Sequence, residues 1–289
     1  MIDITAQVIE NRETTAGYRL LTLEFDKIFN VHAGQFAMLR AHDAYEPLLR
    51  RALAIYDAPS PERLSFLYQV LGKGTQALAQ VAEGGSVDAL LPLGNCWPLP
   101  DEMTEPIGAE QTAGLSMGDD PVAVVAAGGI GSASLLMLGK MLRTSEIETH
   151  IFFGAASEQA AIGCGLDDFY ELGLPLTVST DDGSLGEPGL ITVPLERFLG
   201  DYAGRNIMVY ACGPWPMMGR TAQLAAKSKA KCLVSLEAPM ACGIGICVGC
   251  VFAVKDSEPL GYGTYKRVCT DGTIFPAEEV NWEINAMAH

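Results

Sequence analysis

The chain changes its pattern of apolar residues near position 121, and this change most limits the fold that it can adopt. Before that position, six β-rich runs are separated by turn residues, and a single helical stretch is expected from Gly74 to Glu83. The runs cover residues 6–14, 18–26, 34–41, 50–58, 63–72 and 85–94. Short strands at this spacing predict a closed or nearly closed antiparallel β-barrel over residues 1–100.

From Pro121 onward, patterns typical of buried strands alternate with helical patterns. We expect strands at 122–129, 149–155, 174–180 and 206–213, with a helix at 132–143. This alternation predicts a parallel sheet over residues 121–231 that binds ligands at the carboxyl ends of its strands. The predicted fold class is therefore α/β plus all-β.

Two further segments complete the predicted domain organisation. Residues 101–120 carry six acidic residues and neither lysine nor arginine, which predicts an acidic linker or long loop. Beyond about residue 232 the alternation stops, and residues 232–289 are expected to form a small third module that contains clustered cysteines.

Composition limits the location and the partners of the chain. Acidic residues outnumber basic ones by 35 to 19, and the resulting net charge of −16 disfavours nucleic acid or an anionic membrane as a partner. No segment reaches the roughly 18 unbroken apolar residues of a membrane helix. The N-terminus also lacks the order of a signal peptide. We therefore expect a cytoplasmic protein, in which clustered cysteines hold metal more often than they form disulfides.

Four cysteines, Cys242, Cys247, Cys250 and Cys269, form the pattern C-x4-C-x2-C-x18-C. The first three follow the plant-type spacing of a [2Fe–2S] cluster. Three glycines inside this loop would let backbone N–H groups approach the inorganic sulfides closely. Structural zinc usually uses two C-x2-C knuckles, and the second is missing here, since Cys269 stands alone. The pattern favours an iron–sulfur cluster, with zinc or unligated core cysteines as alternatives.

The other four cysteines predict two different roles. Cys96, Cys164 and Cys232 are expected to be small buried hydrophobic residues. Cys212 lies at the end of a strand, where its thiol and the turn Gly213–Pro214 could approach a nicotinamide ring. A purely structural turn is the alternative for this stretch.

Two glycine-containing stretches are candidates for phosphate binding. Gly128, Gly129 and Gly131 join a strand to a helix and would let a pyrophosphate approach the helix N-terminus, although many α/β folds contain such turns. Gly74 and Thr75 open the helix within the barrel region and could bind a second anion. Upstream of them, Arg50 and Arg51 could pair bidentately with a pyrophosphate. Solvated arginines at a strand edge are the alternative.

The distribution of charge also bears on which nicotinamide cofactor is bound. No lysine or arginine occurs from Thr144 to Glu196, and Asp181 and Asp182 follow an expected strand. The 2′-phosphate of NADP would require basic partners in this half of the domain. NAD(H) is therefore the expected cofactor.

The order of these motifs resembles that of the ferredoxin–NAD(P)H reductase family with an iron–sulfur tail, along nearly the whole chain. Within that family, the chain looks most like the electron-transfer subunits of class 1B dihydroorotate dehydrogenase. The stretches that carry the resemblance are "LLRRALAI", "LGKGT", "PLGNCWPL", "AAGGIGSA", "STDDGSLGEPGLIT", "YACGP", "SLEAPMACGIGICVGC" and "YKRVCTDG". The resemblance implies a six-stranded FAD barrel, an NAD domain and a C-terminal [2Fe–2S] module.

The resemblance also implies the residues of each site. The implied FAD site consists of Arg51, Ala52, Leu53, Ala54, Leu67, Tyr68, Gln69, Gly74 and Thr75. The implied NAD site consists of Gly128, Gly129, Ile130, Gly131, Ser132, Cys212, Gly213 and Pro214. The cluster ligands would be Cys242, Cys247, Cys250 and Cys269.

The chain departs from the family pattern at several of these positions. The flavin motif, normally Arg-Pro-x-Ser, has Ala52 and Ala54 here, so the hydroxyl usually found near the reactive flavin nitrogen is absent. The nucleotide turn usually ends in proline, where this chain has Ser134. An arginine common after the next strand is replaced by Ala156. These departures bear on the tuning of the flavin and on the choice of partner.

Motifs and resemblance together imply an NAD-linked oxidoreductase that acts in electron transport within a hetero-oligomer. FAD and a [2Fe–2S] cluster would pass electrons between NAD(H) and a partner redox protein, with no side chain acting as general acid or base. The expected partner is the FMN-containing catalytic subunit of dihydroorotate dehydrogenase, in pyrimidine biosynthesis. One alternative is a diaphorase-type subunit that feeds ferredoxin, a hydrogenase or another reductase. Another is a zinc-stapled nucleotide-binding module without redox activity.

Overall fold

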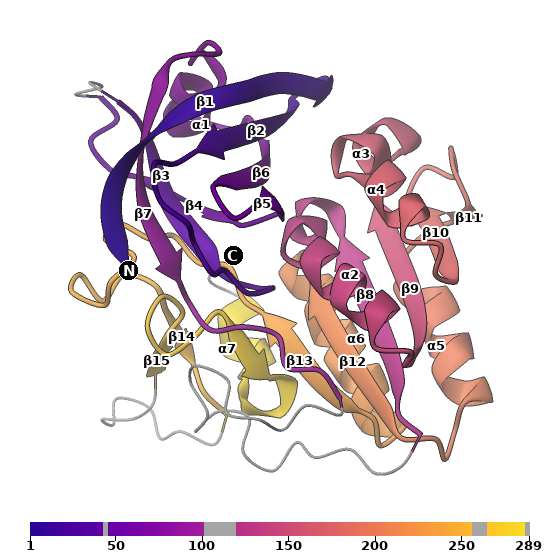
Figure 1. The fold of residues 1–289 in the computed structure, drawn as a ribbon. Helices are drawn as coiled ribbons and strands as arrows, with labels where there is room; N and C mark the ends of the chain where they lie inside the picture. Colours follow the sequence, from indigo (N-terminus) through magenta and orange to yellow (C-terminus); the bar gives the residue numbers. More distant parts are fainter. Residues whose placement is uncertain (43–45, 101–119, 256–264, 287–289) are drawn as a thin grey trace.

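The computed structural model describes residues 1–42, 46–100, 120–255 and 265–286. The acidic linker predicted at 101–120 lies outside these ranges, except for Asp120. Two seven-stranded sheets stand side by side, and the C-terminal segment packs below the first and beside the second (Figure 1). Within the described ranges, no helix is both long enough and apolar enough to cross a lipid bilayer.

The first sheet is antiparallel, with the strand order β4-β3-β7-β1-β2-β6-β5. Its strands are β1 (Ile2–Thr15), β2 (Tyr18–Glu24), β3 (Phe36–Ala41), β4 (Arg51–Ala54), β5 (Asp57–Ser60), β6 (Arg63–Gln69) and β7 (Ser86–Leu93). Helix α1 (Lys73–Ala79) follows β6 and is shorter than expected. The Asn11 amide donates to the carbonyl oxygens of Leu78 and Val81 at 2.9 and 2.8 Å, so a barrel side chain bonds the end of the helix.

The run expected as a single strand at 50–58 bends at Ile55 and Tyr56 and closes the barrel. Its first half, β4, pairs with β3 at one edge of the sheet, and its second half, β5, pairs with β6 at the other edge. At the bend, the Ile55 N–H donates to the Gln35 carbonyl oxygen at 2.9 Å, and the Tyr56 N–H donates to that of Ser65 at 2.8 Å. The antiparallel barrel is thus confirmed, and its six expected runs appear as seven strands because of this bend.

The second sheet has the order β11-β10-β9-β8-β12-β13-β16 and is parallel except for β16. Its strands are β8 (Val122–Gly128), β9 (Glu148–Ala155), β10 (Leu176–Thr180), β11 (Glu187–Pro188), β12 (Ile207–Cys212), β13 (Lys231–Ser235) and β16 (Ile274–Pro276). The helices between them are α2 (Leu136–Thr144), α3 (Glu158–Gly163), α4 (Leu166–Glu171), α5 (Thr192–Asp201) and α6 (Trp215–Lys227). The predicted parallel sheet is therefore confirmed.

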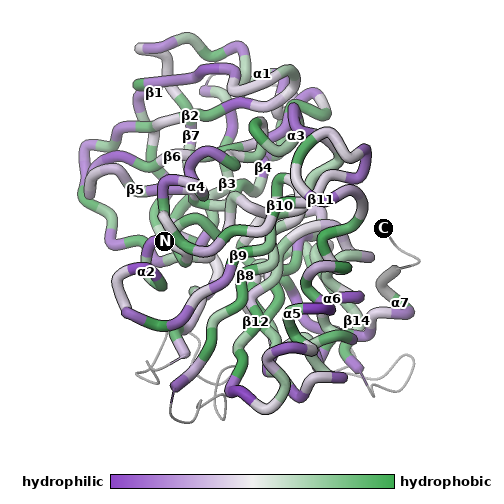
Figure 2. Tube along the Cα trace, turned by 90° about the vertical axis from the view of Figure 1, so that its right-hand side faces the viewer, coloured by the Kyte–Doolittle hydropathy of each residue, from purple (hydrophilic) through white to green (hydrophobic). Residues whose placement is uncertain are grey.

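Strand β8 lies at the centre of this sheet and is buried on both faces. Its alternate residues Ala123, Val125 and Ala127 pack with α2 and α4, whereas Val122, Val124 and Ala126 pack with α5 and α6. Figure 2 shows the resulting hydrophobic band along β8, β9 and β12. Burial on both faces accounts for the continuous apolar run "VAVVAA" in the sequence.

The C-terminal segment contributes a strand to the second sheet and is hydrogen-bonded to the end of the barrel. After β13 come the two-stranded sheet of β14 (Val251–Ala253) and β15 (Tyr265–Arg267), then β16, a 3₁₀ helix (Ala277–Glu279) and α7 (Trp282–Ala286). Strand β16 pairs antiparallel with β13. On its other side, the Asn95 side chain from the end of the barrel accepts from the Ile274 N–H at 2.9 Å and donates to the Ile274 carbonyl oxygen at 2.8 Å. Residues 274–276, which the sequence places in the third module, therefore belong to the second sheet.

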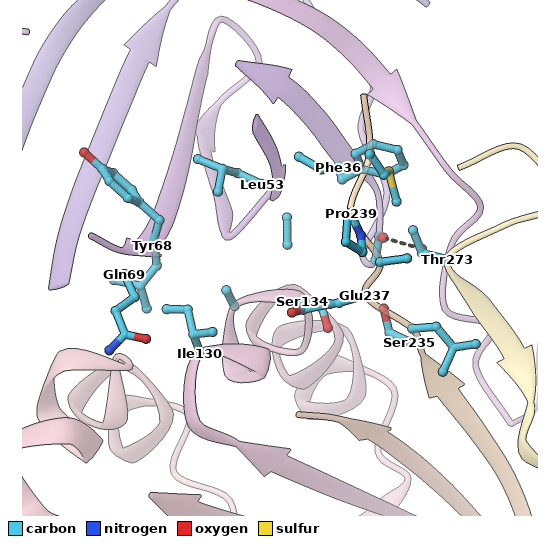
Figure 3. A pocket seen from close by; sticks show the side chains of 18 of the residues that line it. Phe36, Leu53, Tyr68, Gln69, Ile130, Ser134, Ser235, Glu237, Pro239 and Thr273 are labelled. Carbon is cyan, nitrogen blue, oxygen red and sulfur yellow. Dashed lines mark hydrogen bonds between the residues drawn. The ribbon is translucent and has the colours of Figure 1, made fainter. Parts of the chain in front are cut away.

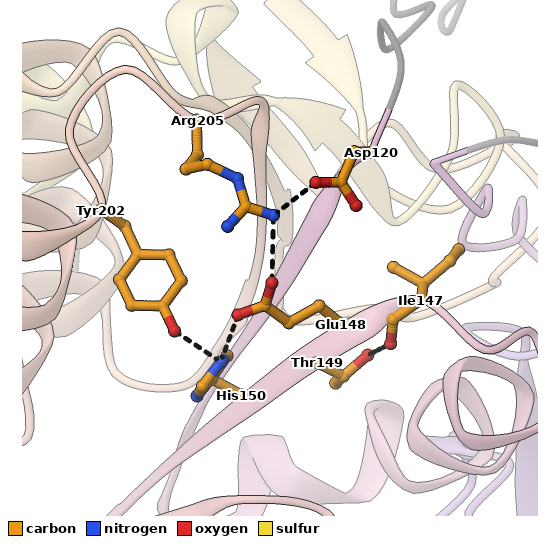
Figure 4. Close-up of polar contacts among 7 residues, drawn as sticks. All are labelled: Asp120, Ile147, Glu148, Thr149, His150, Tyr202 and Arg205. Atoms are coloured by element: carbon orange, nitrogen blue, oxygen red, sulfur yellow. Dashed lines mark hydrogen bonds and ion pairs between the residues drawn. The ribbon is translucent and has the colours of Figure 1, made fainter.

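A polar cluster lies at the amino ends of β8, β9 and β12 in the second sheet (Figure 4). Arg205 donates to Asp120 and to Glu148, each at 3.0 Å. The hydrogen bond to His150, at 3.1 Å, is the main cause that lowers the pKa of Glu148. These partly exposed pairs contribute little to stability. The cluster leaves the opposite edge, with the carboxyl ends of the strands, available for a site.

Candidate functional site

A glycine-rich turn joins β8 to α2 at the carboxyl edge of the second sheet. Residues Gly129–Ser134 form a 3₁₀ helix, and α2 begins only at Leu136, later than the start expected at 132. The Ser132 hydroxyl is fully buried and donates to the Cys164 carbonyl oxygen at 2.6 Å. This bond to a residue outside the turn helps to hold the tighter helical form.

Gly131 packs directly on the backbone at the end of β12. A Cβ atom at this position would lie 2.5 Å from the Gly213 nitrogen and 2.7 Å from the Cys212 carbonyl oxygen. Backbone atoms cannot move aside as a flexible side chain would. The glycine turn and the end of β12 therefore form one continuous floor.

A cavity of about 550 Å³ opens over this floor. Of the residues expected at the NAD site, it is lined by Gly128, Gly129, Ile130, Gly131, Asp181, Gly213 and Pro214. Its mostly preformed, glycine-walled shape fits a dinucleotide, because main chain without Cβ atoms admits phosphate groups. We call it the nucleotide cavity.

Three residues expected at the nucleotide site lie outside the lining of this cavity. Ser132 faces Cys164, and Cys212 is buried in the wall, with 1% of its surface exposed. The Asp182 carboxylate accepts from the Ser184 hydroxyl at 2.6 Å and from its N–H at 3.0 Å, which lowers the pKa of Asp182. Asp182 therefore shapes the turn after β10, whereas Asp181 faces the cavity.

Among the residues of the nucleotide cavity that sequence reasoning missed are Tyr18 and Arg220. Tyr18 belongs to the barrel, and no local pattern relates it to the second sheet. Arg220 lies on α6, beyond the stretch without basic residues, and donates to Glu196 at 2.9 Å. The cavity thus contains one guanidinium that is already paired with a carboxylate.

A second cavity of about 430 Å³ lies between the barrel and the second sheet (Figure 3). Its barrel wall contains six of the residues expected at the FAD site, namely Ala52, Leu53, Ala54, Leu67, Tyr68 and Gln69. The opposite wall comes from the glycine turn, including Ile130 and Ser134, and from the segment after β13. Small side chains on both walls leave a mostly apolar slot with a few polar groups, which suits a planar ring system. We call it the flavin cavity.

Glu237 lines both cavities and was not predicted from the sequence. Glu237 is an exposed residue of the segment that follows β13. Gln69, Ile130 and Trp215 also line both cavities, which therefore adjoin at these residues. Glu237 lies within the stretch "SLEAPMACGIGICVGC", but no local pattern marks it as a site residue, because it reaches the cavities through the placement of β13 beside β12.

Cys212 lies close to Glu237 in the wall between the sheet and the cavities. The pKa of the Cys212 thiol is raised to about 12, mainly by burial and secondly by the nearby Glu237 carboxyl group. The thiol therefore stays protonated near neutral pH. Its proposed approach to a nicotinamide stays a prediction, because it lines neither cavity.

Arg51, Gly74 and Thr75 lie together at the rim of the barrel, outside the lining of the flavin cavity. The Arg51 guanidinium covers Gly74, where a Cβ atom would lie 2.1 Å from Arg51 Nε. The Thr75 hydroxyl accepts from the N–H groups of Leu71 and Gly72 at 3.0 and 3.2 Å. Arg50 instead pairs with Asp3 at 2.7 Å. The expected pyrophosphate contacts of Arg51, Gly74 and Thr75 thus stay predictions.

The four cysteines of the C-terminal segment form two pairs. Cys242 interacts electrostatically with Cys247, and Cys269 does so with Cys250. Among the described residues, no three metal-ligating side chains surround a single point. A [2Fe–2S] cluster takes two thiolates on each of two irons, whereas structural zinc requires four ligands around one ion. The paired arrangement therefore fits the cluster better than zinc.

The backbone of the cysteine loop is preorganised for thiolates. Partial burial would raise the pKa of Cys242, but the N–H groups of Cys247 and Ile244, at 3.4 and 3.5 Å from its sulfur, outweigh burial and lower the pKa to about 6. Burial, together with the neighbouring Cys250, raises the pKa of Cys269 to about 11. The loop thus supplies N–H donors that would stabilise the negative charge of a thiolate-ligated cluster.

The cysteine loop is seated on the barrel next to the flavin cavity. Gly243 adopts a φ of +72°, and a Cβ atom there would lie 2.5 Å from Met38 Cγ. Met240, two residues before Cys242, lines the flavin cavity itself. Three binding regions therefore follow one another: the nucleotide cavity, the flavin cavity and the cysteine loop.

The cysteines outside the loop follow the sequence prediction in part. Cys164 is fully buried, and Cys232 and Cys96 are partly buried. Burial raises the pKa values of Cys164 and Cys232 to about 12 each. Both thiols thus behave as packing groups near neutral pH.

Comparison with solved structures supports the fold. The structure of an NADH-dependent reduced ferredoxin–NADP oxidoreductase aligns with a TM-score of 0.78, covering 98% of this chain and 91% of that chain at 24% identity. A ferredoxin NADP⁺ reductase from Neisseria gonorrhoeae, with bound FAD and NADP, aligns with a TM-score of 0.55 over 78% of this chain and 91% of its own, at 14% identity.

Sequence comparisons are more specific. Residues 237–281 match the family model described as the iron–sulfur cluster binding domain of dihydroorotate dehydrogenase B. A dihydroorotate dehydrogenase B (NAD(+)) electron transfer subunit homolog from Aquifex aeolicus is 34% identical, covering 97% of this chain and 99% of that protein. The electron transfer subunit from Caldanaerobacter subterraneus subsp. tengcongensis is 33% identical, covering 95% of this chain and 97% of that protein. The chain therefore belongs to the family of dihydroorotate dehydrogenase B (NAD(+)) electron transfer subunits.

Proposed function

We propose that this chain passes electrons between NAD(H) and a partner redox protein through FAD and a [2Fe–2S] cluster. The partner is the FMN-containing catalytic subunit of dihydroorotate dehydrogenase, with which the chain forms a hetero-oligomer in the cytoplasm. The observation that supports this proposal most strongly is the order of the three regions. The flavin cavity shares Glu237, Ile130 and Gln69 with the nucleotide cavity, and it shares Met240 with the segment that leads into the cysteine loop.

Each region would contribute through its own residues. The glycine turn admits the pyrophosphate of the dinucleotide, and Asp181 lies where the nucleotide cavity can accept hydroxyl groups. Ala52, Leu53 and Ala54 form one face of the flavin slot, while Ile130 and Ser134 form the other. The Glu237 carboxyl group lies at the junction of the two cavities.

The cofactors would supply the redox chemistry. FAD held in the flavin cavity would supply both two-electron and one-electron redox chemistry, and a [2Fe–2S] cluster held by Cys242, Cys247, Cys250 and Cys269 would supply one-electron chemistry. The chain then needs to position these groups, to stabilise their charges and to exclude water. No catalytic side chain beyond these roles is required.

The proposed function is tested by an anaerobic visible absorption spectrum of the purified protein, before and after addition of NADH. Flavin and iron–sulfur bands that bleach with NADH are the expected result. Reconstitution with the catalytic subunit should then allow dihydroorotate to reduce NAD⁺. A colourless, zinc-containing protein would contradict the proposal.

We expect NADH to reduce the bound flavin faster than NADPH. The nucleotide cavity presents the carboxylate of Asp181, and its one arginine, Arg220, is paired with Glu196. A 2′-phosphate would face the carboxylate without a free cation to neutralise it. Stopped-flow reduction with each nucleotide measures the preference. Equal rate constants at equal concentrations would argue against it.

Exposed apolar residues of the cysteine loop are proposed to contact the partner. Ile246 and Val248 are 77% and 55% exposed and flank Cys247. Ile246→Glu is expected to slow electron transfer to the partner by roughly tenfold, since an apolar contact at an interface is worth about 1–2 kcal/mol. Reduction of the flavin by NADH should be unchanged. Ile28→Glu, at a residue 70% exposed on the barrel, is the control, and equal effects of both substitutions would refute a docking role for Ile246.

A further inference from the structure

Residues 163–165, which comprise the last residue of α3 and the two residues before α4, lie against the walls of both cavities. We call this segment the interdomain wedge. Its two glycines and the cysteine between them connect the second sheet to the barrel at the edge opposite to Asn95. None of the motifs in the sequence points to this segment.

Gly163, the first glycine of the wedge, packs against the end of the β1–β2 hairpin. A Cβ atom at Gly163 would lie 2.4 Å from Thr15 Oγ1 and 2.5 Å from Tyr18 Cδ2. The Thr14 hydroxyl donates to the Gly163 carbonyl oxygen at 3.3 Å. Tyr18 itself lines the nucleotide cavity. This end of the wedge therefore fixes a wall of that cavity.

Gly165, the second glycine of the wedge, packs against Tyr56 in the bend that closes the barrel. Gly165 has a φ of +82°, and a Cβ atom there would lie 2.2 Å from the Tyr56 hydroxyl oxygen and 3.2 Å from Leu67 Cδ2. Tyr56, which is 3% exposed, donates its hydroxyl hydrogen to Asp168 Oδ2 on α4. Burial, followed by the Asp168 charge, raises the pKa of Tyr56 and keeps the hydroxyl protonated. Leu67 lines the flavin cavity.

The middle residue of the wedge holds the glycine turn. The Cys164 carbonyl oxygen accepts the hydrogen bond from the buried Ser132 hydroxyl at 2.6 Å. The turn that forms the floor of the nucleotide cavity is thereby linked to the same segment as Leu67 of the flavin wall. The wedge therefore contacts both the glycine turn of the nucleotide cavity and the barrel wall of the flavin cavity, and a hydride would pass between these two walls.

We propose that Tyr56, through its hydrogen bond to Asp168 and its contact with Gly165, is a positioning residue for hydride transfer between the two cavities. The proposal rests on the proposed function. In that reaction, NADH becomes NAD⁺ as a hydride, with its two electrons, passes to FAD. Hydride transfer requires reacting atoms about 3–3.5 Å apart, and a displacement of about 1 Å can slow a reaction by about 10²-fold. Tyr56 is not among the residues that line either cavity, so its effect is exerted through the wedge.

The test is Tyr56→Phe in the full chain loaded with FAD and cluster. The rate constant of flavin reduction at saturating NADH should fall by roughly tenfold or more, with flavin content unchanged. The long-wavelength absorption band of nicotinamide stacked on flavin should weaken, and amide hydrogen exchange at residues 128–134 should accelerate. Tyr170→Phe, at an exposed tyrosine of α4, is the matched control and should change none of these.

A pair of variants at Asp168 separates positioning from a general loss of stability. Asp168→Asn keeps an oxygen that can accept from Tyr56 and should retain most of the reduction rate. Asp168→Ala should reproduce the slow reduction and the weakened stacking band of Tyr56→Phe. If Tyr56→Phe fails to fold, this pair alone decides, because it leaves the tyrosine in place.

Two outcomes distinguish failure of this inference from failure of the proposed function. If NADH does not bleach the flavin of the parent protein, the proposed function fails, and the positioning role fails with it. If NADH bleaches the flavin of the parent protein, and the flavin of Tyr56→Phe is reduced as fast with an unchanged stacking band, the positioning role alone is overturned. A lower melting temperature without a slower rate would likewise assign Tyr56 a purely structural role.

Discussion

Replacing Cys247 with serine is expected to remove the iron–sulfur absorbance while the flavin stays bound. Cys247 pairs with Cys242 through its thiol, and its N–H donates to the Cys242 sulfur at 3.4 Å. Loss of one of four thiolates should lower the bound iron by roughly tenfold or more, because cluster binding depends on the full ligand set. The flavin cavity contains no residue of the pair, so flavin content should not change. Iron and sulfide analysis with a visible spectrum measures both.

Cys232→Ser is the control for this substitution. Cys232 lies in β13, partly buried and outside the loop, and its thiol has a pKa raised by burial to about 12. The same chemical change there should leave the cluster intact. Unchanged cluster absorbance in Cys247→Ser would refute the ligand assignment, and stoichiometric zinc in the parent protein would refute the cluster itself.

Replacing Gly131 with alanine is expected to lower both the stability and the affinity for NADH. The added Cβ would meet backbone atoms of Cys212 and Gly213 at 2.5–2.7 Å, so the glycine turn would have to move away from β12. Overpacking of this kind costs about 1–3 kcal/mol of the free energy of unfolding. Because the same turn forms the floor of the nucleotide cavity, the dissociation constant for NADH should rise. Chemical denaturation and titration with NADH measure the two effects.

Gly200→Ala is the matched control. Gly200 lies within α5, and a Cβ atom there would have no neighbour within 4 Å. Alanine favours a helix interior by about 0.5–1 kcal/mol over glycine, so this variant should be equal to or more stable than the parent. If Gly131→Ala binds NADH as tightly as Gly200→Ala does, the glycine turn is not part of the nucleotide site.

Most of the fold could be predicted because its elements are encoded by local patterns. All six expected runs of the barrel and the parallel strands β8, β9, β10 and β12 appear where the apolar periodicity places them. The bend at Ile55 and Tyr56 was missed because nothing local interrupts that run, and the two halves find different partners. Strand β16 was missed because three residues carry no period, and pairing with β13 creates the strand.

The residues of the candidate site also fall into those that a local motif indicates and those that only the packing of distant segments brings to the site. Cys242 could be predicted from the spacing of its motif, and Ile130 was implied by the resemblance to the reductase family. Glu237, Tyr18 and Arg220 could not, since they reach the cavities only through the packing of distant segments. Arg51 and Thr75 illustrate the reverse case, in which a recognisable motif lies at the rim of the barrel instead of in the cavity wall.

The attachment of β16 has a consequence for how electrons could leave this chain. A reductase whose cluster domain swings on a hinge shuttles its charge by diffusion, and the rate then depends on the length of the tether and on viscosity. Here β16, which follows the cysteine loop in the chain, pairs with β13, which precedes the loop. The Asn95 side chain also bonds the main chain of β16 at Ile274. The loop is therefore anchored before and after its cysteines. The partner must therefore come to the loop. A chimera in which a relative's cysteine segment replaces this one would also need the strand of that relative that corresponds to β16.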